Sequence, residues 1–343
     1  MIIFYVILLV VILSGLRYKS YNEEYLSVQQ SNATKGIFIW LVFIGHIIPY
    51  ITAIEPFEIV ADRAATDVVA TLRQLVVVPF MFYSGYGVMC SVKNRGAGYV
   101  EDIPKRRVLN TMLNFGVAVS LFVALNLILD VSMDVKQVLL SFVCWESVGN
   151  SNWYIFVICI CYLISYLSYK LFGYSKRSLV ANIALMSIFA WAISYFKGSW
   201  WYDTCLAYSA GSIYCFYKEE IERRIDSNYV LYAILGCVAF VASYVAMLYA
   251  PFAQSLIFMN ICSICFSLFM IILAMRLQLR SRVLEWSGRN LFPLYIYQRI
   301  PMIMFSAICG GCLVDEFRYL YVVVCAVVSI MVVYLYKYIA IKL

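Results

Sequence analysis

Residues 229–250, YVLYAILGCVAFVASYVAMLYA, form an unbroken stretch without a charged side chain. A helix of about 20 apolar residues is long enough to cross the hydrocarbon core of a bilayer, which is about 30 Å thick. Stretches of similar length, separated by short charged segments, recur along the whole chain. A transmembrane barrel would instead show shorter segments of alternating polarity. The pattern therefore predicts an all-α polytopic membrane protein.

The composition supports this fold class. Of the 343 residues, 64% are hydrophobic and 13% are charged, and the mean hydropathy is +0.85. Soluble domains are about half apolar and about a quarter charged. We predict eleven spans, of which the first is short, at residues 2–16, 35–54, 71–92, 108–129, 152–171, 179–196, 199–217, 229–250, 254–276, 290–312 and 319–339.

The basic residues predict the orientation. Twenty of the 26 Lys and Arg residues fall on one set of alternating connections, five fall on the other set, and Arg299 lies inside a span. Because cytoplasmic connections are enriched in Lys and Arg, we expect the N-terminus outside and the C-terminus in the cytoplasm. The expected location is the cell (inner or cytoplasmic) membrane. The net charge of +7 thus reflects topology, and nucleic acid is not expected as a partner.

The twelve cysteines lie mostly inside the predicted spans. No cysteine pair has metal-ligand spacing with a histidine nearby, and the chain has a single histidine. We interpret the cysteines as small apolar packing residues rather than disulfides or zinc ligands. No metal is expected.

That single histidine, His46, lies inside a span. It follows Lys35 by eleven residues, which corresponds to about 16 Å along a helix and a place near the membrane midplane. Gly45 would let a neighbouring helix approach closely, and Pro49 suits a helix end or a kink. One interpretation is a histidine bonded between helices for packing. The other is a functional group, because an ionisable residue is costly inside a membrane.

Arg299 reaches a similar depth on another span. It follows Arg289 by ten residues, or about 15 Å. Tyr295, Gln298 and Arg299 share one face of that helix by their spacing. A shared polar cavity with His46 is one interpretation, and structural pairing or snorkelling of Arg299 is the other. Asp203 and Asn260 are weaker candidates for the same cavity.

The segment Lys105, Arg106 and Arg107 adjoins the next predicted span on the cytoplasmic side. It serves as a topology signal on charge alone. It also suits the phosphates of a nucleotide-like donor, since Arg matches phosphate geometry. The long connections near 55–70 and 130–151 are predicted to be external, as interfacial helices or acceptor-binding loops.

Several segments occur in an order that resembles one known family. They are residues 32–46 (NATKGIFIWLVFIGH), with ten residues between Lys35 and His46; residues 79–87 (PFMFYSGYG); Lys105-Arg106-Arg107; Asn152-Trp153-Tyr154; and residues 287–297 (SGRNLFPLYIY). This order is similar to that of the acyltransferase type 3 membrane family and covers about residues 31–340. The family's ten spans would form a domain over 31–343, and residues 1–30 would add a short span and a cytoplasmic linker.

The resemblance implies O-acylation of a glycan. The acyl group, usually acetyl, would come from cytoplasmic acyl-CoA, a substrate rather than a bound cofactor. The acceptor would be a surface polysaccharide, such as a capsule, or a lipid-linked precursor, with membrane lipid as a further partner. His46 would be catalytic, Lys35 and residues 105–107 would bind the donor, and Trp153 becomes a cavity candidate. The chain departs from the family pattern with Lys35 for Arg, Asn32 for Asp, Asn110 for a second loop Arg, and Gln298 for a histidine.

The chemistry suits these residues. A neutral imidazole can take the proton of a hydroxyl that attacks a thioester, or can carry the acyl group transiently. Arg299, Gln298 or a tyrosine such as Tyr295 would stabilise the developing oxyanion. The sequence has neither a Gly-x-Ser-x-Gly elbow nor an acidic residue five positions after His46. The alternatives are a glycan or lipid transporter or flippase lined by the same polar residues, and an unrelated membrane O-acyltransferase.

Overall fold

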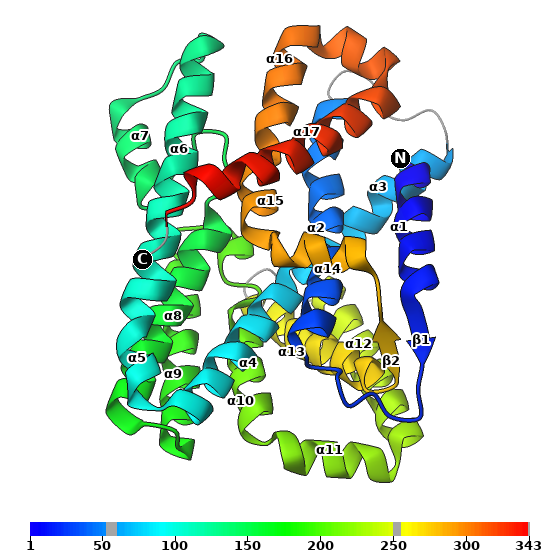
Figure 1. The fold of residues 1–343 in the computed structure, drawn as a ribbon, viewed down its shortest axis with the longest axis vertical. Coiled ribbons are helices and arrows are strands. Elements are labelled where there is room, and N and C mark those ends of the chain that lie inside the picture. Colours follow the sequence, from blue (N-terminus) through cyan, green and yellow to red (C-terminus); the bar gives the residue numbers. More distant parts are fainter. Residues whose placement is uncertain (53–59, 250–254, 342–343) are drawn as a thin grey trace.

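The computed structural model describes residues 1–52, 60–249 and 255–341, and these are almost wholly helical (Figure 1). The helices are α1 (Ile2–Gly15), α2 (Val28–Ile51), α3 (Val60–Leu72), α4 (Val78–Arg95), α5 (Ala97–Asp102), α6 (Asn110–Ile128), α7 (Val135–Phe142), α8 (Trp153–Phe172), α9 (Lys176–Ile193), α10 (Cys205–Phe216), α11 (Lys218–Ser227), α12 (Tyr229–Tyr249), α13 (Ser255–Ala274), α14 (Arg282–Arg289), α15 (Leu291–Tyr297), α16 (Arg299–Glu316) and α17 (Arg318–Ile339). Short turns of other helix types are η1 (Arg73–Val77), η2 (Ile103–Leu109) and η3 (Ser199–Trp201), and the strands β1 (Leu16–Tyr18) and β2 (Leu277–Leu279) pair antiparallel.

Among the described residues, nine helical segments are long and apolar enough to cross a membrane. They correspond to nine of the eleven predicted spans. The other two are shorter helices. Helix α1, with 14 residues, agrees with the short span predicted at 2–16, whereas α10, with 12 residues, is shorter than its predicted span. The prediction of a span over 199–217 was too long because residues 199–201 form the separate turn η3. Most residues of α10 are buried, so this helix lies inside the protein.

The outward-facing side chains of the membrane-spanning helices are largely apolar. On α12, exposed side chains include Val230, Leu231, Ile234, Leu235 and Val238. Large contiguous apolar surfaces are rare on soluble monomers, whereas lipid is an apolar solvent for them and α-helices satisfy their own backbone groups there. The protein is an all-α, multi-pass membrane protein, as the sequence predicted.

Helix α2 begins earlier than the predicted span. Ser27 accepts a hydrogen bond from the backbone N–H of Gln30 and caps the first turn, as serine commonly does. Five of the seven residues from Val28 to Thr34 are polar although the segment is helical, so hydropathy alone does not include it. His46 consequently lies in the second half of a 24-residue helix.

The crossing of α2 and α14 fixes the position of the helix that carries His46. A Cβ atom on Gly36 would lie 2.0 Å from the carbonyl oxygen of Leu284, and one on Gly288 would lie 1.9 Å from that of Asn32. Glycine at both positions therefore lets the two backbones touch, which drives helix association in membranes. The Trp40 indole N–H donates to Ser287 Oγ at 3.0 Å across the same crossing. The chain continues from α14 into α15, which lies beside α2 (Figure 1).

Candidate active site

His46 and Gln298 lie in direct contact although 252 residues separate them in sequence. The side-chain amide nitrogen of Gln298 lies 3.0 Å from His46 Nδ1 and 3.4 Å from the carbonyl oxygen of Tyr295. Gln298 is 1% exposed, whereas His46 is partly exposed. The imidazole is thus held on one side by a buried amide and is accessible on another.

The contact with Gln298 determines which ring nitrogen of His46 carries the proton. A neutral imidazole carries one proton, and the partner of one ring nitrogen decides which nitrogen holds it. The Gln298 amide has a donor and an acceptor that exchange places on a half turn of the amide. With the amide nitrogen facing both the Tyr295 carbonyl and Nδ1, Nδ1 accepts a hydrogen bond and Nε2 holds the ring proton. A half turn of the amide would place its oxygen against Nδ1, move the ring proton to that nitrogen and free Nε2. Gln298 therefore decides which ring nitrogen of His46 can act as a base.

Gln298 and Arg299 stand at a break in the predicted span 290–312. Helix α15 ends at Tyr297 and α16 begins at Arg299. Pro301 explains the break, because it has no N–H to donate to the Tyr297 carbonyl four residues earlier. Breaks inside membrane helices are tolerated where they are buried in protein or line a cavity. Gln298 keeps helical backbone angles, so the interruption at the level of His46 affects the hydrogen-bond ladder and not the course of the helix.

Arg299 and Tyr295 complete the surroundings of the imidazole. Arg299 Nη2 donates to the Tyr50 hydroxyl at 3.4 Å, and its charge acts on both His46 and Tyr295. The rings of His46 and Tyr295 have centroids 6.2 Å apart. Within the described chain, Arg299 Nε and the Tyr295 hydroxyl are buried and lack hydrogen-bond partners of normal geometry. Two donor groups beside His46 are therefore open to a ligand.

A cavity of 310 Å³ extends from this site to the basic segment. Tyr295 lines one end, and Arg106 and Arg107 line the other. The remaining lining comes from α4, η2, α6, α8, α15 and α17 and includes Phe80, Ser84, Asn110, Thr111, Asn114, Tyr154, Ile155, Ile158, Tyr162, Leu291, Phe292 and Tyr336. A pocket of about this size, largely aromatic with a few polar groups, is typical of small-molecule sites.

The basic end of the cavity concentrates positive charge. The Arg107 guanidinium lies 5.9 Å from the centre of the Tyr162 ring, and Lys35 is close enough for its charge to act on Arg107. In the described residues, no carboxylate forms an ion pair with Lys35 or Arg107. Two neighbouring cations without an acidic partner favour an anion between them.

The turn η2 presents Arg107 to this cavity. It is a π-helical turn, and Pro104 stands at its start. Proline provides no N–H, and single π-turns within α-helices recur at functional sites. The local widening between α5 and α6 places Arg106 and Arg107 at the mouth of the cavity, and Arg107 remains exposed there.

Comparison with known protein families identifies the family of this chain. The model of the acyltransferase domain matches residues 28–338. The chain belongs to the acyltransferase type 3 family. No curated protein matches the chain, and no solved structure matches it. The protein is therefore a membrane acyltransferase.

The fold of this acyltransferase brings together three of the four residues predicted to bind the acyl donor. Arg106 and Arg107 line the cavity and Lys35 lies beside Arg107. Arg106 also forms an ion pair with Asp102 at 2.9 Å, which leaves Arg107 as the arginine without an acidic partner. Lys105 is exposed and does not line the cavity.

Of the predicted site residues, Tyr295, Arg106 and Arg107 line the cavity, whereas His46, Gln298, Arg299 and Lys35 lie beside these residues and are not part of its lining. Asn260, Asp203 and Trp153 do not line it either. Asn260 bonds the Tyr202 carbonyl at 2.9 Å and the Leu206 N–H at 3.0 Å, so it holds the start of α10. Asp203 is buried at the same end of α10. Trp153 contacts the Tyr154 ring edge-on at a centroid distance of 5.9 Å, and only Tyr154 lines the cavity.

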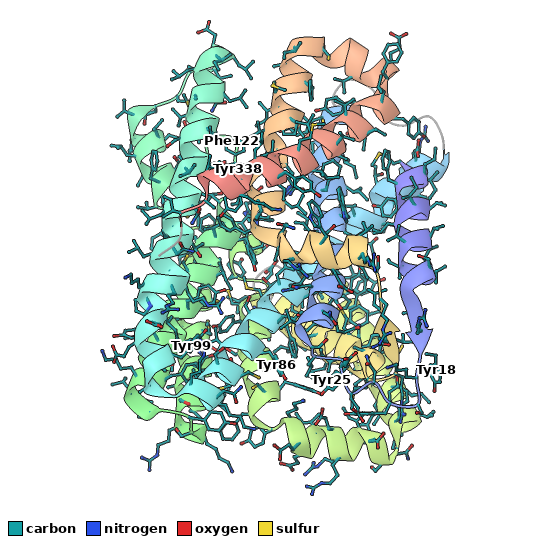
Figure 2. The ribbon with its side chains drawn as sticks, in the orientation of Figure 1. Tyr18, Tyr25, Tyr86, Tyr99, Phe122 and Tyr338 are labelled. Atoms are coloured by element: carbon teal, nitrogen blue, oxygen red, sulfur yellow. The ribbon has the colours of Figure 1, made fainter. Side chains whose placement is uncertain are left out.

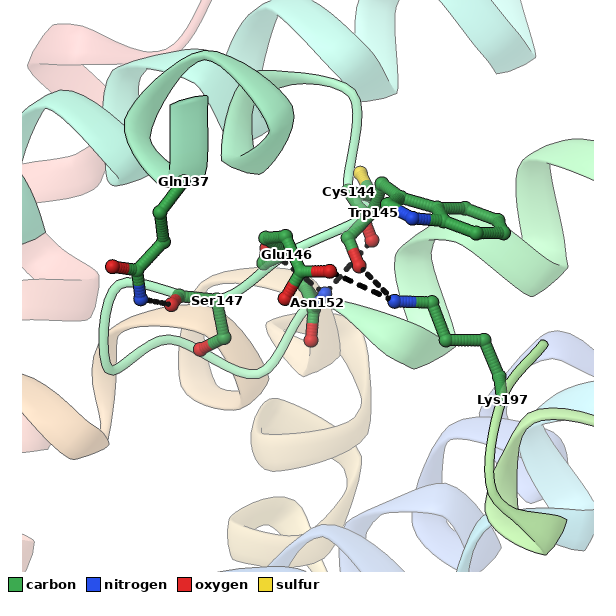
Figure 3. Close-up of polar contacts among 7 residues, drawn as sticks. All are labelled: Gln137, Cys144, Trp145, Glu146, Ser147, Asn152 and Lys197. Atoms are coloured by element: carbon green, nitrogen blue, oxygen red, sulfur yellow. Dashed lines mark hydrogen bonds and ion pairs between the residues drawn. The ribbon is translucent and has the colours of Figure 1, made fainter. Parts of the chain in front are cut away.

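Polar contacts hold the connection between α7 and α8, which reaches the site at Ser151 (Figure 3). Lys197 donates to the Trp145 carbonyl at 2.7 Å and to Glu146 at 3.2 Å. Asn152 donates to the Glu146 carbonyl at 3.0 Å. These hydrogen bonds fix the connection in place, and Ser151 lies next to the Tyr295 hydroxyl.

Sequence reasoning missed several lining residues. Tyr154, Ile158 and Tyr162 line the cavity, and their spacing of four residues places them on one face of α8. Two tyrosines on one stripe of an otherwise apolar helix are a signal that could have identified this face. Ser84 lies within the segment 79–87 but was not singled out as a site residue.

Proposed function

We propose that this acyltransferase moves an acetyl group from cytoplasmic acetyl-CoA to a hydroxyl of a surface polysaccharide or of a lipid-linked glycan precursor. The observation that carries the proposal is one cavity lined by both Arg107 and Tyr295. Arg107 has no acidic partner among the described residues, and Tyr295 lies beside His46. The donor phosphates would bind between Arg107 and Lys35, and the thioester would reach Tyr295 along the cavity. The orientation with the basic segment in the cytoplasm rests on the distribution of Lys and Arg.

The chemistry then proceeds by direct transfer. The Gln298 amide first makes a half turn, so that its oxygen accepts a hydrogen bond from His46 Nδ1–H. His46 Nε2 then takes the proton of the acceptor hydroxyl as the hydroxyl oxygen attacks the thioester carbonyl. Arg299 and the Tyr295 hydroxyl stabilise the oxyanion of the tetrahedral intermediate. When the intermediate collapses, the C–S bond breaks and the CoA thiolate leaves with the proton from the imidazolium. The products are the O-acetyl ester and free CoA.

A vesicle experiment tests this function. Inside-out membrane vesicles that contain the protein receive acetyl-CoA labelled in the acetyl group, together with endogenous lipid-linked glycan. We expect the label in an alkali-labile ester on carbohydrate. Glycan that crosses the membrane without acquiring label would contradict the proposal and favour the transporter.

Arg107→Ala is expected to raise the KM for acetyl-CoA by about 10- to 100-fold, with little change in kcat, because one charge-assisted contact to phosphate is lost. Lys105→Ala is the matched control, since it removes a neighbouring charge that does not line the cavity. Steady-state kinetics with varied donor measure both variants. A pure loss of kcat in Arg107→Ala, or an equal rise in KM for Lys105→Ala, would contradict a phosphate site at Arg107.

Gln298→Leu is expected to lower kcat by about 10- to 100-fold, because the imidazolium loses its hydrogen-bond acceptor. Gln298→Glu should restore most of the activity, since a carboxylate always accepts from Nδ1–H. The single histidine also lets ¹⁵N-histidine labelling report the ring protonation without overlap. We expect a change in the Nδ1 and Nε2 shifts in Gln298→Leu. Equal activity of the leucine and glutamate variants would contradict this orienting role.

A further inference from the structure

Cys90 on α4 and Cys215 on α10 lie side by side although 125 residues separate them. Their Sγ atoms are 2.7 Å apart, and both cysteines are free. Non-bonded carbon atoms rest at about 3.5–4.0 Å, and sulfur is larger than carbon. A disulfide bond is about 2.05 Å long. The two sulfurs are therefore closer than a relaxed contact and within a small movement of a covalent bond.

The packing of α4 against α10 causes this approach. A Cβ atom on Gly85 would lie 1.9 Å from the Tyr208 carbonyl oxygen, and one on Gly211 would lie 2.1 Å from that of Phe82. The backbones thus touch at the crossing. Cys90 and Cys215 follow these two glycines by about one helical turn each, so their side chains meet at the next level of the same interface.

Two lysines lie near the pair. Lys93, in the last turn of α4, and Lys218 each form an ion pair of 3.5 Å with a glutamate of α11, and the charges of both lysines act on Cys90. Cys90 is partly exposed. Tyr86, one turn before Cys90, lies in the part of the molecule next to α11 (Figure 2). Reactive cysteines occupy partly exposed, electropositive surroundings of this kind.

The other described cysteines differ from this pair in lacking a cysteine sulfur within hydrogen-bond range, not in burial. Cys215 is itself buried, whereas Cys237 and Cys309 are exposed. Within the part of the chain that the structure describes, Cys90 and Cys215 make the one contact between two cysteine sulfurs in hydrogen-bond range. The general interpretation of cysteines as packing residues therefore suits the others but does not account for this pair.

We propose that Cys90 and Cys215 are an oxidation-sensitive pair that forms a disulfide between α4 and α10. Hydrogen peroxide is the oxidant. Cys90 reduces it to water and becomes a sulfenic acid, and the Cys215 sulfur then displaces a second water to form the S–S bond. In total, two thiols lose two electrons and two protons, and one peroxide becomes two waters. A cytoplasmic dithiol reverses the reaction, because that compartment keeps most thiols reduced.

The disulfide fixes one wall of the donor cavity. Helix α4 contributes Phe80 and Ser84 to the lining, and a covalent link to the buried α10 prevents the two helices from separating. Because the sulfurs move only slightly, the oxidised protein retains the folded arrangement. Closing a long loop restricts the unfolded chain, so oxidation raises the midpoint of thermal unfolding by several degrees.

Peptide mapping of the purified full-length protein tests the proposal. Samples reduced with dithiothreitol or oxidised with hydrogen peroxide are alkylated with N-ethylmaleimide, digested without reductant and analysed by mass spectrometry. We expect a cross-linked peptide pair with Cys90 and Cys215 in the oxidised sample alone, together with the rise in Tm. Dithiothreitol should reverse both changes.

Variants separate this bond from general oxidation. C90S and C215S should each lose the cross-link and the Tm rise, while C159S, which removes a buried thiol elsewhere, should keep both. Full alkylation of Cys90 and Cys215 in the oxidised wild-type protein would overturn the proposal. So would a Cys90 sulfinic acid beside an alkylated Cys215. These readouts do not depend on acyl transfer.

Discussion

Replacing His46 with alanine is expected to lower the rate of acyl transfer by about 10²- to 10⁴-fold, the range that a positioned general base contributes. No other histidine in the chain can substitute for it. The KM for acetyl-CoA should change little, because the Arg107 end of the cavity is untouched. Purified wild-type and variant protein, compared for kcat with labelled acetyl-CoA and glycan acceptor, measure the effect.

Ile48→Ala is the matched control for His46→Ala. Ile48 lies two residues further along α2 and packs against a neighbouring apolar cluster, so the variant removes a large side chain from the same helix without removing the imidazole. Comparable expression and membrane insertion of both variants, with activity retained only in Ile48→Ala, would identify a chemical role. A His46→Ala enzyme with a normal rate would exclude His46 as the base.

Hydropathy predicted the lipid-facing helices closely and the buried ones poorly. The stretch 229–250 became α12, Tyr229–Tyr249, because its length and composition alone satisfy the bilayer. The polar first turns of α2 were missed because capping by Ser27, not apolarity, starts that helix. The interior helix α10 is shorter than its predicted span, since a helix surrounded by protein does not need to match the membrane thickness.

Depth and helical spacing were sufficient to select the core of the candidate site. Matching depth on two spans selected His46 and Arg299, and helical spacing added Gln298, whose side-chain nitrogen lies 3.0 Å from His46 Nδ1. The same criteria kept Asp203 and Asn260 as weaker candidates and could not exclude them, because polarity inside a span does not say which way a helix is rotated. That rotation depends on contacts such as the one between Gly288 and the Asn32 carbonyl, which a single sequence does not reveal.

Replacing Arg299 with methionine is expected to lower kcat by about 10²- to 10³-fold, the loss that follows removal of one oxyanion donor. Methionine lacks the guanidinium group but keeps an unbranched apolar stem, so the packing around the stem is largely preserved. The Nε group of Arg299 is buried and unpaired within the described residues, which leaves a donor available for the transition state. Steady-state kinetics with both substrates at saturation isolate the effect on kcat.

Two further variants distinguish oxyanion stabilisation from a structural role for Arg299. Tyr50→Phe removes the hydroxyl that accepts from Arg299 Nη2 and should cost about 10-fold or less, because the guanidinium remains. Arg299→Lys keeps the charge but loses the planar donor geometry, so its kcat should lie between those of the wild type and Arg299→Met. If Arg299 only held helices together, Arg299→Met would lower the Tm and the yield of folded protein while the folded fraction kept a normal kcat.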